Sequence, residues 1–408
     1  MSKLQDLINR LCPNGVPYLK FGDVLEFRRG QTITEKDSIP GDYPVIAGGQ
    51  KPAYYHNAYN RTGETIAVAG SGAYAGFVSW WTSPIFLSDA FSVHPKKDNL
   101  LPKYVYYCMI NMQQQIHNTK KGSGVPHVHG SSIAKFLIPV PPIEIQEEIV
   151  KILDRFAEYA AELQAELQAR KEQYEYYRNL LLSFNPSASD DEPTLTTWGG
   201  HSYKIAWKPM GEILHSIKTG LNPRSFFRLN TEDAYNFYVT IREIRNGVLQ
   251  FTEKTDRMND FALILCNNRS NLEINDVLFS GTGTIGETYV IEREPKNWNI
   301  KEGVYSLKPI TTIVNPKYLR YILSAEHIRK SYLAMAEGGT VKSVSMKSLA
   351  NLIIPIPPLE LQEKIVAILD RFETLVNDLT QGLPAEIAAV REQYEYYRNK
   401  LLTFKQLA

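Results

Sequence analysis

The sequence has few of the features that mark secreted or membrane proteins. Its three cysteines, Cys12, Cys108 and Cys266, lie far apart and form no C-x-x-C pair. This excludes a disulfide framework and a cysteine-rich zinc site, and we expect a reducing cytoplasm. No apolar run approaches the roughly 18 residues that a membrane span needs. The first residues carry scattered charges instead of the apolar segment of a signal peptide, so we expect no membrane partner.

Catalytic signatures are also missing. The chain contains no G-x-x-x-x-G-K-[ST] phosphate loop, which argues against a DNA-translocating motor. It contains neither N-P-P-Y nor D-P-P-Y, the tetrapeptides of adenine methyltransferases. A stand-alone methyltransferase is therefore disfavoured, although "FSGTGTIGETYV" (Phe279 to Val290) includes both G-x-G-x-x-G and F-x-G-x-G.

The context of this glycine motif decides its interpretation. A dinucleotide fingerprint opens a helix after its strand, whereas "ETYVIERE" continues as a strand. We interpret the glycines as a tight turn between two strands, or as a loop whose backbone approaches DNA closely. Asp276 with Glu294 and Lys296 resembles a nuclease D…E-x-K set, but Pro295 is unhelpful there and we expect no catalytic role. His127 and His129 have no other ligands nearby in the sequence, so we expect no metal site.

The charge is low overall and unevenly distributed. The chain carries 45 basic and 44 acidic residues, a net charge of +1. Residues 143–183 alone hold nine acids and five bases, a net of −4, which leaves +5 for the rest of the chain. An acidic segment in an otherwise basic chain is compatible with nucleic-acid binding.

One long segment of the sequence occurs twice. "IPVPPIEIQEEIVKILDRF" (Ile138 to Phe156) returns as "IPIPPLELQEKIVAILDRF" (Ile354 to Phe372), with 14 of 19 positions identical. Further on, "EQYEYYRNLLLSF" (Glu172 to Phe184) returns as "EQYEYYRNKLLTF" (Glu392 to Phe404), now with an offset of 220 instead of 216. The second copy therefore has four extra residues, near "QGLPAEI" (Gln381 to Ile387). Such internal repeats organise the whole chain.

Each copy is predicted to be a long helix. The P-x-P-P run forces extended backbone before it. Beyond the prolines of the first copy, apolar residues recur at steps of three and four, which is the pattern of a coiled-coil seam. These residues are Ile145, Ile149, Ile152, Phe156, Ala160, Leu163, Leu167, Tyr174, Tyr177 and Leu181. The seam packs either against the other copy or against the domain of its own copy. Gly382 and Pro384 predict a kink or interruption in the second helix.

The segments before the helices also resemble each other, more weakly. Paired stretches are "FGDVLEFRRG" with "MGEILHSIKTG", "GSGAYAG" with "GTGTIGE", "PKYVYYCM" with "PKYLRYIL", and "GSGVPHVHGSSIAKFLIP" with "GGTVKSVSMKSLANLIIP". "ETIAVAG" and "DVLFSG" are predicted to be strands, and "PKYVYYCMINMQQQI" and "PKYLRYILSAEHIRKSY" to be helices. We therefore expect an α+β fold with a variable domain at 1–142, a central helix at 143–184, a polar linker and second domain at 185–358, and a distal helix at 359–408.

Two diverged domains, each followed by a P-x-P-P-x-E-x-Q helix ending in E-Q-Y-x-Y-Y-R, resemble the specificity subunit of type I restriction–modification systems. The resemblance covers essentially the whole chain. It implies two target recognition domains, each reading one half of an asymmetric bipartite double-stranded DNA site, linked by two long antiparallel coiled-coil helices in a pseudo-two-fold repeat. It also implies a non-catalytic subunit that binds two methyltransferase subunits and recruits restriction subunits. S-adenosylmethionine, ATP and Mg²⁺ would belong to those partners. An orphan or sister-system specificity subunit is the alternative.

Candidate DNA contacts are basic, amide or hydroxyl side chains on turns, where arginine reads guanine and asparagine or glutamine reads adenine. In the first domain these are Arg28, Arg29, Gln31, Ser71, Tyr74, Lys120, Lys121, Ser123 and His127. In the second domain they are Lys218, Asn222, Arg224, Arg228, Arg242, Arg245, Thr282, Thr284, Lys342 and Ser343. The loops that carry Lys121 and Lys342 are the best candidates, because they occupy matching positions just before each helix.

Candidate docking residues lie on the helices. Tyr174 and Tyr177 fit the seam, whereas Tyr176 and its counterpart Tyr396 are off it and either face a protein partner or add to helix packing. The glutamines of the P-x-P-P-x-E-x-Q motif, Gln146 and Gln362, are further docking candidates.

Overall fold

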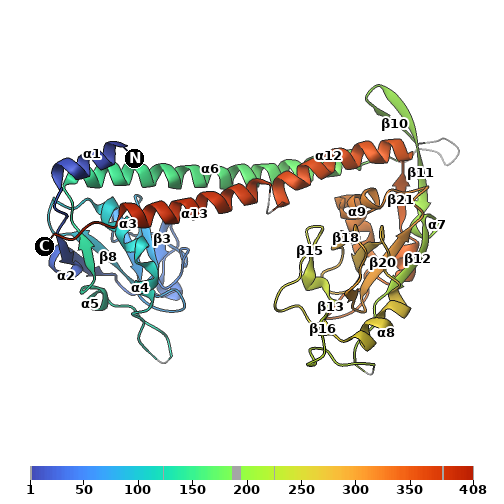
Figure 1. Cartoon of the computed structure of the whole chain (residues 1–408), viewed down its shortest axis with the longest axis horizontal. Helices are drawn as coiled ribbons and strands as arrows, with labels where there is room; N and C mark the ends of the chain where they lie inside the picture. The colour runs from blue at the N-terminus through green and yellow to red at the C-terminus, as the bar shows by residue number, and fades with distance from the viewer. Residues whose placement is uncertain (1, 123, 186–193, 225, 379–380, 408) are drawn as a thin grey trace. The chain divides into compact units, whose positions relative to one another are not determined.

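The computed structural model describes residues 2–122, 124–185, 194–224, 226–378 and 381–407 (Figure 1). It divides into two compact units. Unit 1 comprises residues 1–164 and 386–408, and unit 2 comprises residues 165–385. Each unit thus combines one variable domain with segments of both helical copies. Among the described residues, no helix is long and apolar enough to cross a membrane.

Unit 1 is a mixed α+β structure. Its helices are α1 (Ser2–Leu11), α2 (Phe21–Val24), η1 (Glu35–Asp37), α3 (Pro102–Asn111), α4 (Gln113–His117), α5 (Gly130–Ile133), the first part of α6 (Ile143–Leu181) and most of α13 (Leu383–Leu401). Its strands are β1 (Tyr18–Lys20), β2 (Leu25–Arg29), β3 (Tyr43–Ile46), β4 (Tyr55–His56), β5 (Thr65–Ala69), β6 (Val78–Trp81), β7 (Phe86–Leu87), β8 (Ala90–Pro95) and β9 (Leu137–Pro139).

Unit 2 contains the same kinds of element and several more. Its helices are the last part of α6, α7 (Met210–Ile213), η2 (Ile241–Glu243), α8 (Asp260–Ser270), α9 (Pro316–Ser324), α10 (Glu326–Ala334), α11 (Met346–Ala350) and α12 (Leu359–Asn377). Its strands are β10 (Thr194–Trp198), β11 (His201–Pro209), β12 (Leu214–Thr219), β13 (Asn236–Val239), β14 (Ile244–Arg245), β15 (Val248–Leu249), β16 (Arg257–Met258), β17 (Val277–Ser280), β18 (Thr288–Val290), β19 (Trp298–Ile300), β20 (Val304–Pro309) and β21 (Ile353–Ile356).

The sheets of the two units have one topology. A four-stranded antiparallel sheet has the order β2-β8-β5-β6 in unit 1 and β12-β20-β17-β18 in unit 2. A three-stranded sheet has the order β4-β3-β7 in unit 1 and β16-β13-β19 in unit 2, each with one parallel pair. The expected repeat of the domains is therefore confirmed. The extra residue in "MGEILHSIKTG" forms a β-bulge between Leu214 and Ser216, where the register against β20 shifts.

The glycine motif is a turn between strands. β17 pairs antiparallel with β18, and β5 pairs antiparallel with β6 in unit 1. The second strand in each case confirms that no helix follows the glycines. Gly286 N donates to Ser280 O, and Gly76 N donates to Ala69 O at the same place in unit 1. Gly286 and Gly76 are therefore equivalent residues. The turn in unit 2 is thus one residue shorter than the ungapped match of "GSGAYAG" with "GTGTIGE" implied.

The two helical copies differ in continuity. Helix α6 is unbroken over 39 residues. The second copy is interrupted, because α12 ends at Asn377 and α13 begins at Leu383. At the interruption Gly382 N donates to Asp378 O, and the prediction that Gly382 and Pro384 interrupt the helix is confirmed. The four extra residues of the second copy thus coincide with the interruption.

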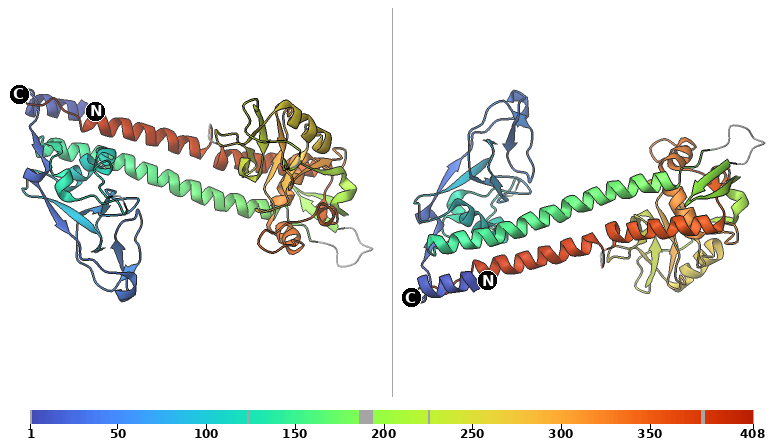
Figure 2. Two further views of the ribbon diagram at one scale, coloured as in Figure 1. Left: turned by 90° about the horizontal axis from the view of Figure 1, so that it is seen from below. Right: turned by 90° about the horizontal axis from the view of Figure 1, so that it is seen from above.

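The helical copies pair with each other inside each unit. In unit 1, Phe156 of α6 stacks on Tyr397 of α13, with ring centroids 5.6 Å apart at 28°. Tyr159, one turn later on α6, donates to Glu386 near the start of α13, so the helices are antiparallel. In unit 2, Tyr177 of α6 stacks on Phe372 of α12 at 5.6 Å and 27°. The same phenylalanine and tyrosine of the repeat meet in both units, and Figure 2 shows the helices side by side.

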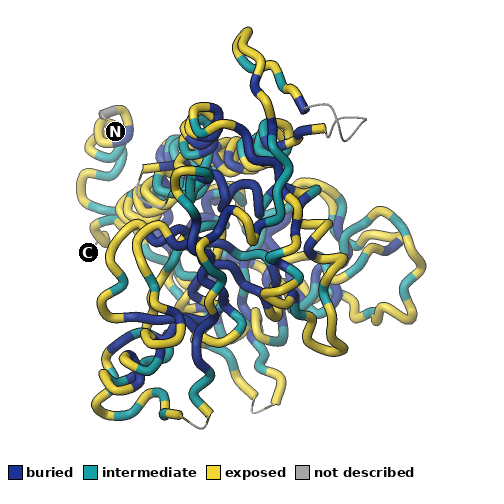
Figure 3. Tube along the Cα trace, turned by 90° about the vertical axis from the view of Figure 1, so that its right-hand side faces the viewer, coloured by how far each residue is buried: buried dark blue, intermediate teal, exposed yellow. Residues whose placement is uncertain are grey.

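Each helix also covers the domain that precedes it. Ile145, Ile149 and Leu153 of α6 belong to the core of unit 1 together with residues of its sheet and of α3. Leu361, Ile365 and Leu369 are the fully buried counterparts on α12. Each helix therefore packs both against the other copy and against its own domain, and Ile145 and Ile149 of the predicted seam contact the domain core. The end of β11 pairs with β21 as β1 pairs with β9 in unit 1, whereas the hairpin that β11 forms with β10 projects as a mostly exposed segment at the top of Figure 3.

Candidate nucleic-acid interface

In each unit the glycine turn lies against the loop that precedes the long helix. In unit 1, Gly72 N donates to Pro126 O at 3.0 Å, and Ser71 forms a β-bridge with His127. In unit 2, Gly283 N donates to Lys342 O at 3.1 Å, and Thr282 forms a β-bridge with Ser343. The glycine turn and the loop before the helix, distant in the chain, thus form one surface in each domain.

Backbone conformation explains the glycines at this contact. Gly72 has φ of +81° and Gly283 has φ of +79°. Residues other than glycine rarely adopt this backbone conformation. The pairing of the two loops therefore depends on these two residues. The hydroxyl-bearing neighbours Thr282 and Thr284 are exposed beside the turn of unit 2.

Two hollows in unit 1 gather several candidates. Arg29 and His127 line one of about 300 Å³, together with Gly70 and Asp89. Asp89 accepts a hydrogen bond from Ser71 Oγ. Lys120 and Lys121 line a second hollow of about 640 Å³.

The other candidates of unit 1 are more scattered. Tyr74 is 46% exposed. Arg28 and Gln31 are exposed, but Arg28 Nη2 lies 2.7 Å from Glu26 Oε2, which raises the pKa of the guanidinium and satisfies part of its charge. Ser123 lies outside the described residues.

Unit 2 gathers its candidates around a hollow of about 530 Å³. Asn222, Arg224, Arg242 and Thr282 line it, together with Lys301. Arg242 donates to Asp256 at 2.6 Å, which orients its guanidinium. Basic and amide donors around one hollow can contact both phosphates and base edges.

Several candidates of unit 2 do not join this hollow. Lys218 is exposed on β12, Arg228 on the loop before β13, and Arg245 on the β14–β15 hairpin. Lys342 is exposed and Ser343 half-buried at the loop contact itself. The surface around Thr282 is therefore the more compact candidate.

Sequence reasoning missed Arg61. Its guanidinium donates to the carbonyl oxygens of Arg28 and Arg29 at 3.1 and 3.0 Å, and Nε donates to Ser92 Oγ at 2.7 Å. Burial lowers the pKa of Arg61. Arg61 thus fixes the end of β2, which carries Arg29. The sequence could not show this role, because Arg61 and Arg29 are 32 residues apart in the chain.

The nuclease-like set is not assembled. Asp276 is 3% exposed and accepts hydrogen bonds from Ser306 Oγ at 2.7 Å and Lys308 Nζ at 2.8 Å. Glu294 and Lys296 form a separate exposed ion pair at 3.2 Å. In the described part of the chain, no cluster of three His, Cys, Asp or Glu side chains could hold a metal ion.

The two docking candidates of the tyrosine cluster are on the surface. Tyr176 is 63% exposed and Tyr396 is 60% exposed. Tyr176 contacts only the edge of Tyr177 among ring pairs, and Tyr396 likewise contacts Tyr397. Both are available to a partner in the chain as described.

The glutamine candidates are corrected by the structure. Gln146 and Gln362 are 0% exposed. Gln146 accepts from Leu101 N at 2.9 Å and donates to Asn99 O and Pro141 O, both at 2.8 Å. Gln362 accepts from Asn315 N at 2.7 Å and donates to Ile313 O and Pro357 O at 3.0 and 2.7 Å. They join each helix to its own domain and offer nothing to a partner.

The two halves of the chain each match the model of a known family. The type I restriction modification DNA specificity domain matches residues 13–172 and again residues 207–389. The chain belongs to this specificity family. Its two matches each span one variable domain and much of a helical copy, which agrees with the internal repeat.

Curated relatives of the specificity family cover nearly the whole chain. A putative type I restriction enzyme specificity subunit of Haemophilus influenzae is 29% identical over 90% of this chain and 89% of its own. The EcoR124I/EcoR124II specificity subunit of Escherichia coli is 28% identical over 99% of this chain and 98% of its own.

Solved structures share the fold. The S subunit of a type I restriction–modification system from M. genitalium is 16% identical, with a TM-score of 0.56 over 95% of this chain and 96% of that chain. A chain from a structural study of complex assembly in the type I R-M system is 19% identical, with a TM-score of 0.59 over 96% and 98%. The expected α+β architecture with two repeated domains and two long helices is thereby confirmed.

Proposed function

We propose that this chain is the DNA-recognition subunit of a type I restriction–modification complex, in which each unit reads one half of an asymmetric target. The observation that carries the proposal is the loop surface built twice on one frame with different side chains. Arg29 and His127 occupy it in unit 1, and Arg224, Arg242 and Thr282 in unit 2. A shared frame with different donors fits two different short DNA sequences.

The side chains divide into two roles. Arg29, Arg224 and Asn222 line hollows and are proposed to contact base edges, where arginine pairs with guanine and asparagine with adenine. Lys121 and Lys342 are exposed and are proposed to contact phosphates, which adds affinity without sequence preference.

The chain is proposed to be non-catalytic and to need no cofactor of its own. The proposed DNA contacts are basic, amide and hydroxyl side chains. Asp276 of the nuclease-like set is buried and accepts hydrogen bonds from Lys308 and Ser306. S-adenosylmethionine, ATP and Mg²⁺ are proposed to belong to methyltransferase and restriction subunits. Tyr176 and Tyr396, both exposed on the helices, are proposed to dock two methyltransferase subunits.

Two single substitutions test whether each unit recognises a different half of the DNA target. Arg29→Ala and Arg224→Ala are each expressed with the methyltransferase partner, and the methylated sites are mapped across a genome. Each variant is expected to relax one half-site and leave the other unchanged. Lys296→Ala, which removes an exposed charge outside both surfaces, is the control. The proposal fails if both variants alter the same half-site or if neither alters any.

A deletion tests whether the helices set the spacing of the half-sites. Removing four residues around Leu167 takes out about one helical turn of α6. The mapped target is expected to keep both half-site sequences and to change the number of base pairs between them. Altered half-site sequences would contradict this part of the proposal.

A further inference from the structure

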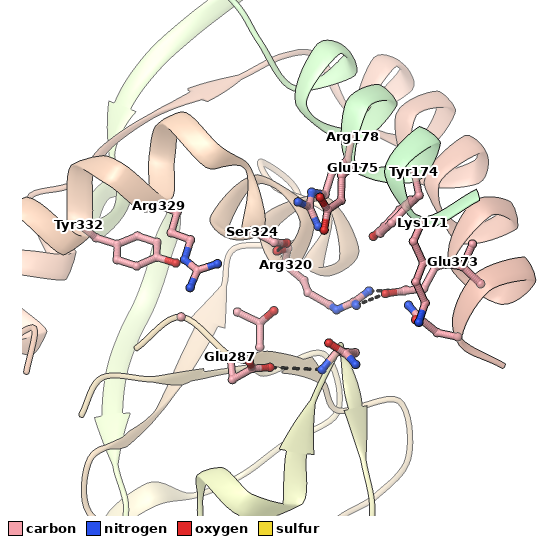
Figure 4. Close-up of a pocket in the computed structure, with 16 residues that line it drawn as sticks. Lys171, Tyr174, Glu175, Arg178, Glu287, Arg320, Ser324, Arg329, Tyr332 and Glu373 are labelled. Atoms are coloured by element: carbon pink, nitrogen blue, oxygen red, sulfur yellow. Dashed lines mark hydrogen bonds and ion pairs between the residues drawn. The ribbon is translucent and has the colours of Figure 1, made fainter. Parts of the chain in front are cut away.

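Unit 2 contains a hollow that neither the DNA surface nor the docking tyrosines use. It has a volume of about 300 Å³ and lies between α6, α12, α9, α10 and the glycine turn. Its lining is mainly polar and includes Arg178, Arg320, Arg329, Tyr332 and Glu287, as Figure 4 shows. All of these elements belong to unit 2.

Unpartnered donors concentrate at this hollow. Among the described residues, four buried side-chain polar atoms have no hydrogen-bond partner, and three of them belong to lining residues: Arg178 Nε, Arg320 Nε and Tyr332 Oη. Tyr332 is 0% exposed and Arg320 is 8% exposed. Burial raises the pKa of Tyr332 to about 12, so its hydroxyl keeps its proton near neutral pH. Buried groups of this kind are normally satisfied, and three together call for an acceptor.

The equivalent place in unit 1 shows what a satisfied version looks like. Arg398, the counterpart of Arg178, donates through Nε to Asn111 Oδ1 at 3.3 Å. Gln113, the counterpart of Arg329, donates to Gly76 O at 2.7 Å and accepts from Val78 N at 3.0 Å. Ile116 packs against Gly76 where Tyr332 packs against Gly286.

Unit 2 has replaced these neutral partners with charged or polar donors. The match of "PKYVYYCM" with "PKYLRYIL" pairs Tyr106 with Arg320. The equivalent contacts of Ile116 and Tyr332 with the glycine turns pair these two residues, and the residue three positions earlier is Gln113 in unit 1 and Arg329 in unit 2. The frame is the same, so the excess of donors is specific to unit 2.

The charges around the hollow favour an anion. Lys171, Arg178 and Arg329 have no ion-pair partner within the described residues. Arg320 forms a bidentate pair with Glu373, which leaves its Nε free. Two carboxylates also line the hollow, Glu175 and Glu287, and Glu287 accepts from Asn246 N at 3.2 Å. Three unpaired cations against two carboxylates leave one excess positive charge.

We propose that this hollow binds a phosphate-type oxyanion, with Arg329 and Arg178 as its main charged partners. Guanidinium groups suit phosphate oxygens because they donate two parallel hydrogen bonds at once. The mainly polar lining and the small volume fit one or two phosphoryl groups and leave little apolar surface for a nucleobase. The site does not depend on the proposed DNA recognition, so either proposal can fail without the other.

Titration calorimetry on the purified full chain tests the site. Pyrophosphate and dimethyl phosphate are titrated separately at constant ionic strength, the first standing for a free phosphate and the second for a DNA phosphodiester. At least one is expected to bind at a single site. Arg329→Gln, which installs the residue of unit 1, is expected to weaken that binding about tenfold.

The matched control is Lys330→Gln. Lys330 is the next residue on α10, pairs with Glu326 on the surface and does not line the hollow. Its loss removes the same charge and is expected to leave the affinity within about twofold. If Arg329→Gln alters the circular-dichroism melt, Lys171→Gln replaces it.

The outcomes separate cleanly. Binding of pyrophosphate alone supports a free phosphate ligand, and binding of dimethyl phosphate supports a DNA phosphate. No saturable binding of either below about 10 mM overturns the proposal and leaves water as the occupant. Equal weakening by Arg329→Gln and Lys330→Gln also overturns it, because the effect would then come from net charge alone.

Discussion

The two units share one contact between a helical copy and a domain helix, but fill it with different side chains. Where the end of one helical copy meets helix α3 or α9, unit 1 has Tyr106, Asn111 and Gln113, and their amides satisfy neighbouring donors and acceptors. At the same place unit 2 has Arg320, which pairs with Glu373, and Arg329, which has no ion pair among the described residues. The comparison teaches that a shared backbone frame does not impose one interior chemistry.

Other contacts are kept in both units. Tyr104 and Tyr318 donate to the carbonyls of Pro139 and Pro355 at 3.1 and 2.9 Å. Tyr107 and Tyr321 donate to Asp154 and Asp370 on the long helices. Together with the buried glutamines, these contacts fix how each helix leaves its domain. The following substitutions test which contacts are truly equivalent.

The largest expected effect comes from the buried glutamines. Gln146→Ala and Gln362→Ala each leave three backbone groups without their side-chain partner, one buried and two partly buried, so we expect each to lower the free energy of unfolding by about 4 kcal/mol. Urea denaturation measures the loss, and hydrogen exchange locates it in the altered unit. If one variant lost less than about 1 kcal/mol, the two contacts would not be equivalent.

The Arg320–Glu373 pair tests the difference between the units. Glu373→Ala introduces the alanine that the first helical copy has at the equivalent position, Ala157. It leaves the buried guanidinium of Arg320 unpaired and is expected to lower the free energy of unfolding by about 3 kcal/mol. The double variant Arg320→Met with Glu373→Ala is expected to recover more than half of that loss, because it removes both charges. Equal losses in the single and double variants would show that packing, and not the unpaired charge, dominates.

The repeated aromatic stacks test helix pairing. Phe156→Ala and Phe372→Ala each remove a half-buried ring, and we expect about 2 kcal/mol of destabilisation from both. Thermal unfolding followed by circular dichroism gives the comparison. A much smaller effect for Phe372→Ala would indicate that the interruption beyond α12 weakens the pairing in unit 2.

The lysines of the two loop surfaces test their electrostatic role. Lys121→Ala and Lys342→Ala are each expected to weaken DNA binding by about 1 kcal/mol, equally for matched and mismatched duplexes. The slope of log affinity against log salt concentration should fall by about 1 in each variant. Fluorescence anisotropy at several salt concentrations measures both. A loss restricted to matched DNA would assign these lysines to base reading instead.

The smallest effect on stability is expected from the exposed tyrosines. The double variant Tyr176→Ala with Tyr396→Ala should change the free energy of unfolding by less than about 0.5 kcal/mol, because both rings are mostly in solvent. The same variant should lose methyltransferase subunits on co-purification. Retention of the subunits by a folded double variant would reject the docking role.

Local patterns predicted more of the fold than of the site. The strands at Thr65–Ala69 and Val277–Ser280, the strand after the second glycine turn and the break near Gly382 all follow from periodicity, glycine and proline. The docking role given to Gln146 and Gln362 was wrong, because the backbone groups that they satisfy at Asn99 and Ile313 lie 47 and 49 residues away.

The sequence by itself determined the duplication, the order of domains and helices, and the two loops that form each candidate surface. These features follow from sequence repeats and from the short-range steric preferences of glycine and proline, so they can be predicted without knowing which distant residues are in contact. Only the tertiary structure decided which polar groups are buried and paired, because burial depends on neighbours remote in the chain. Arg61 beside Arg29, and the three unpartnered donors of unit 2, became visible only when those neighbours were in place.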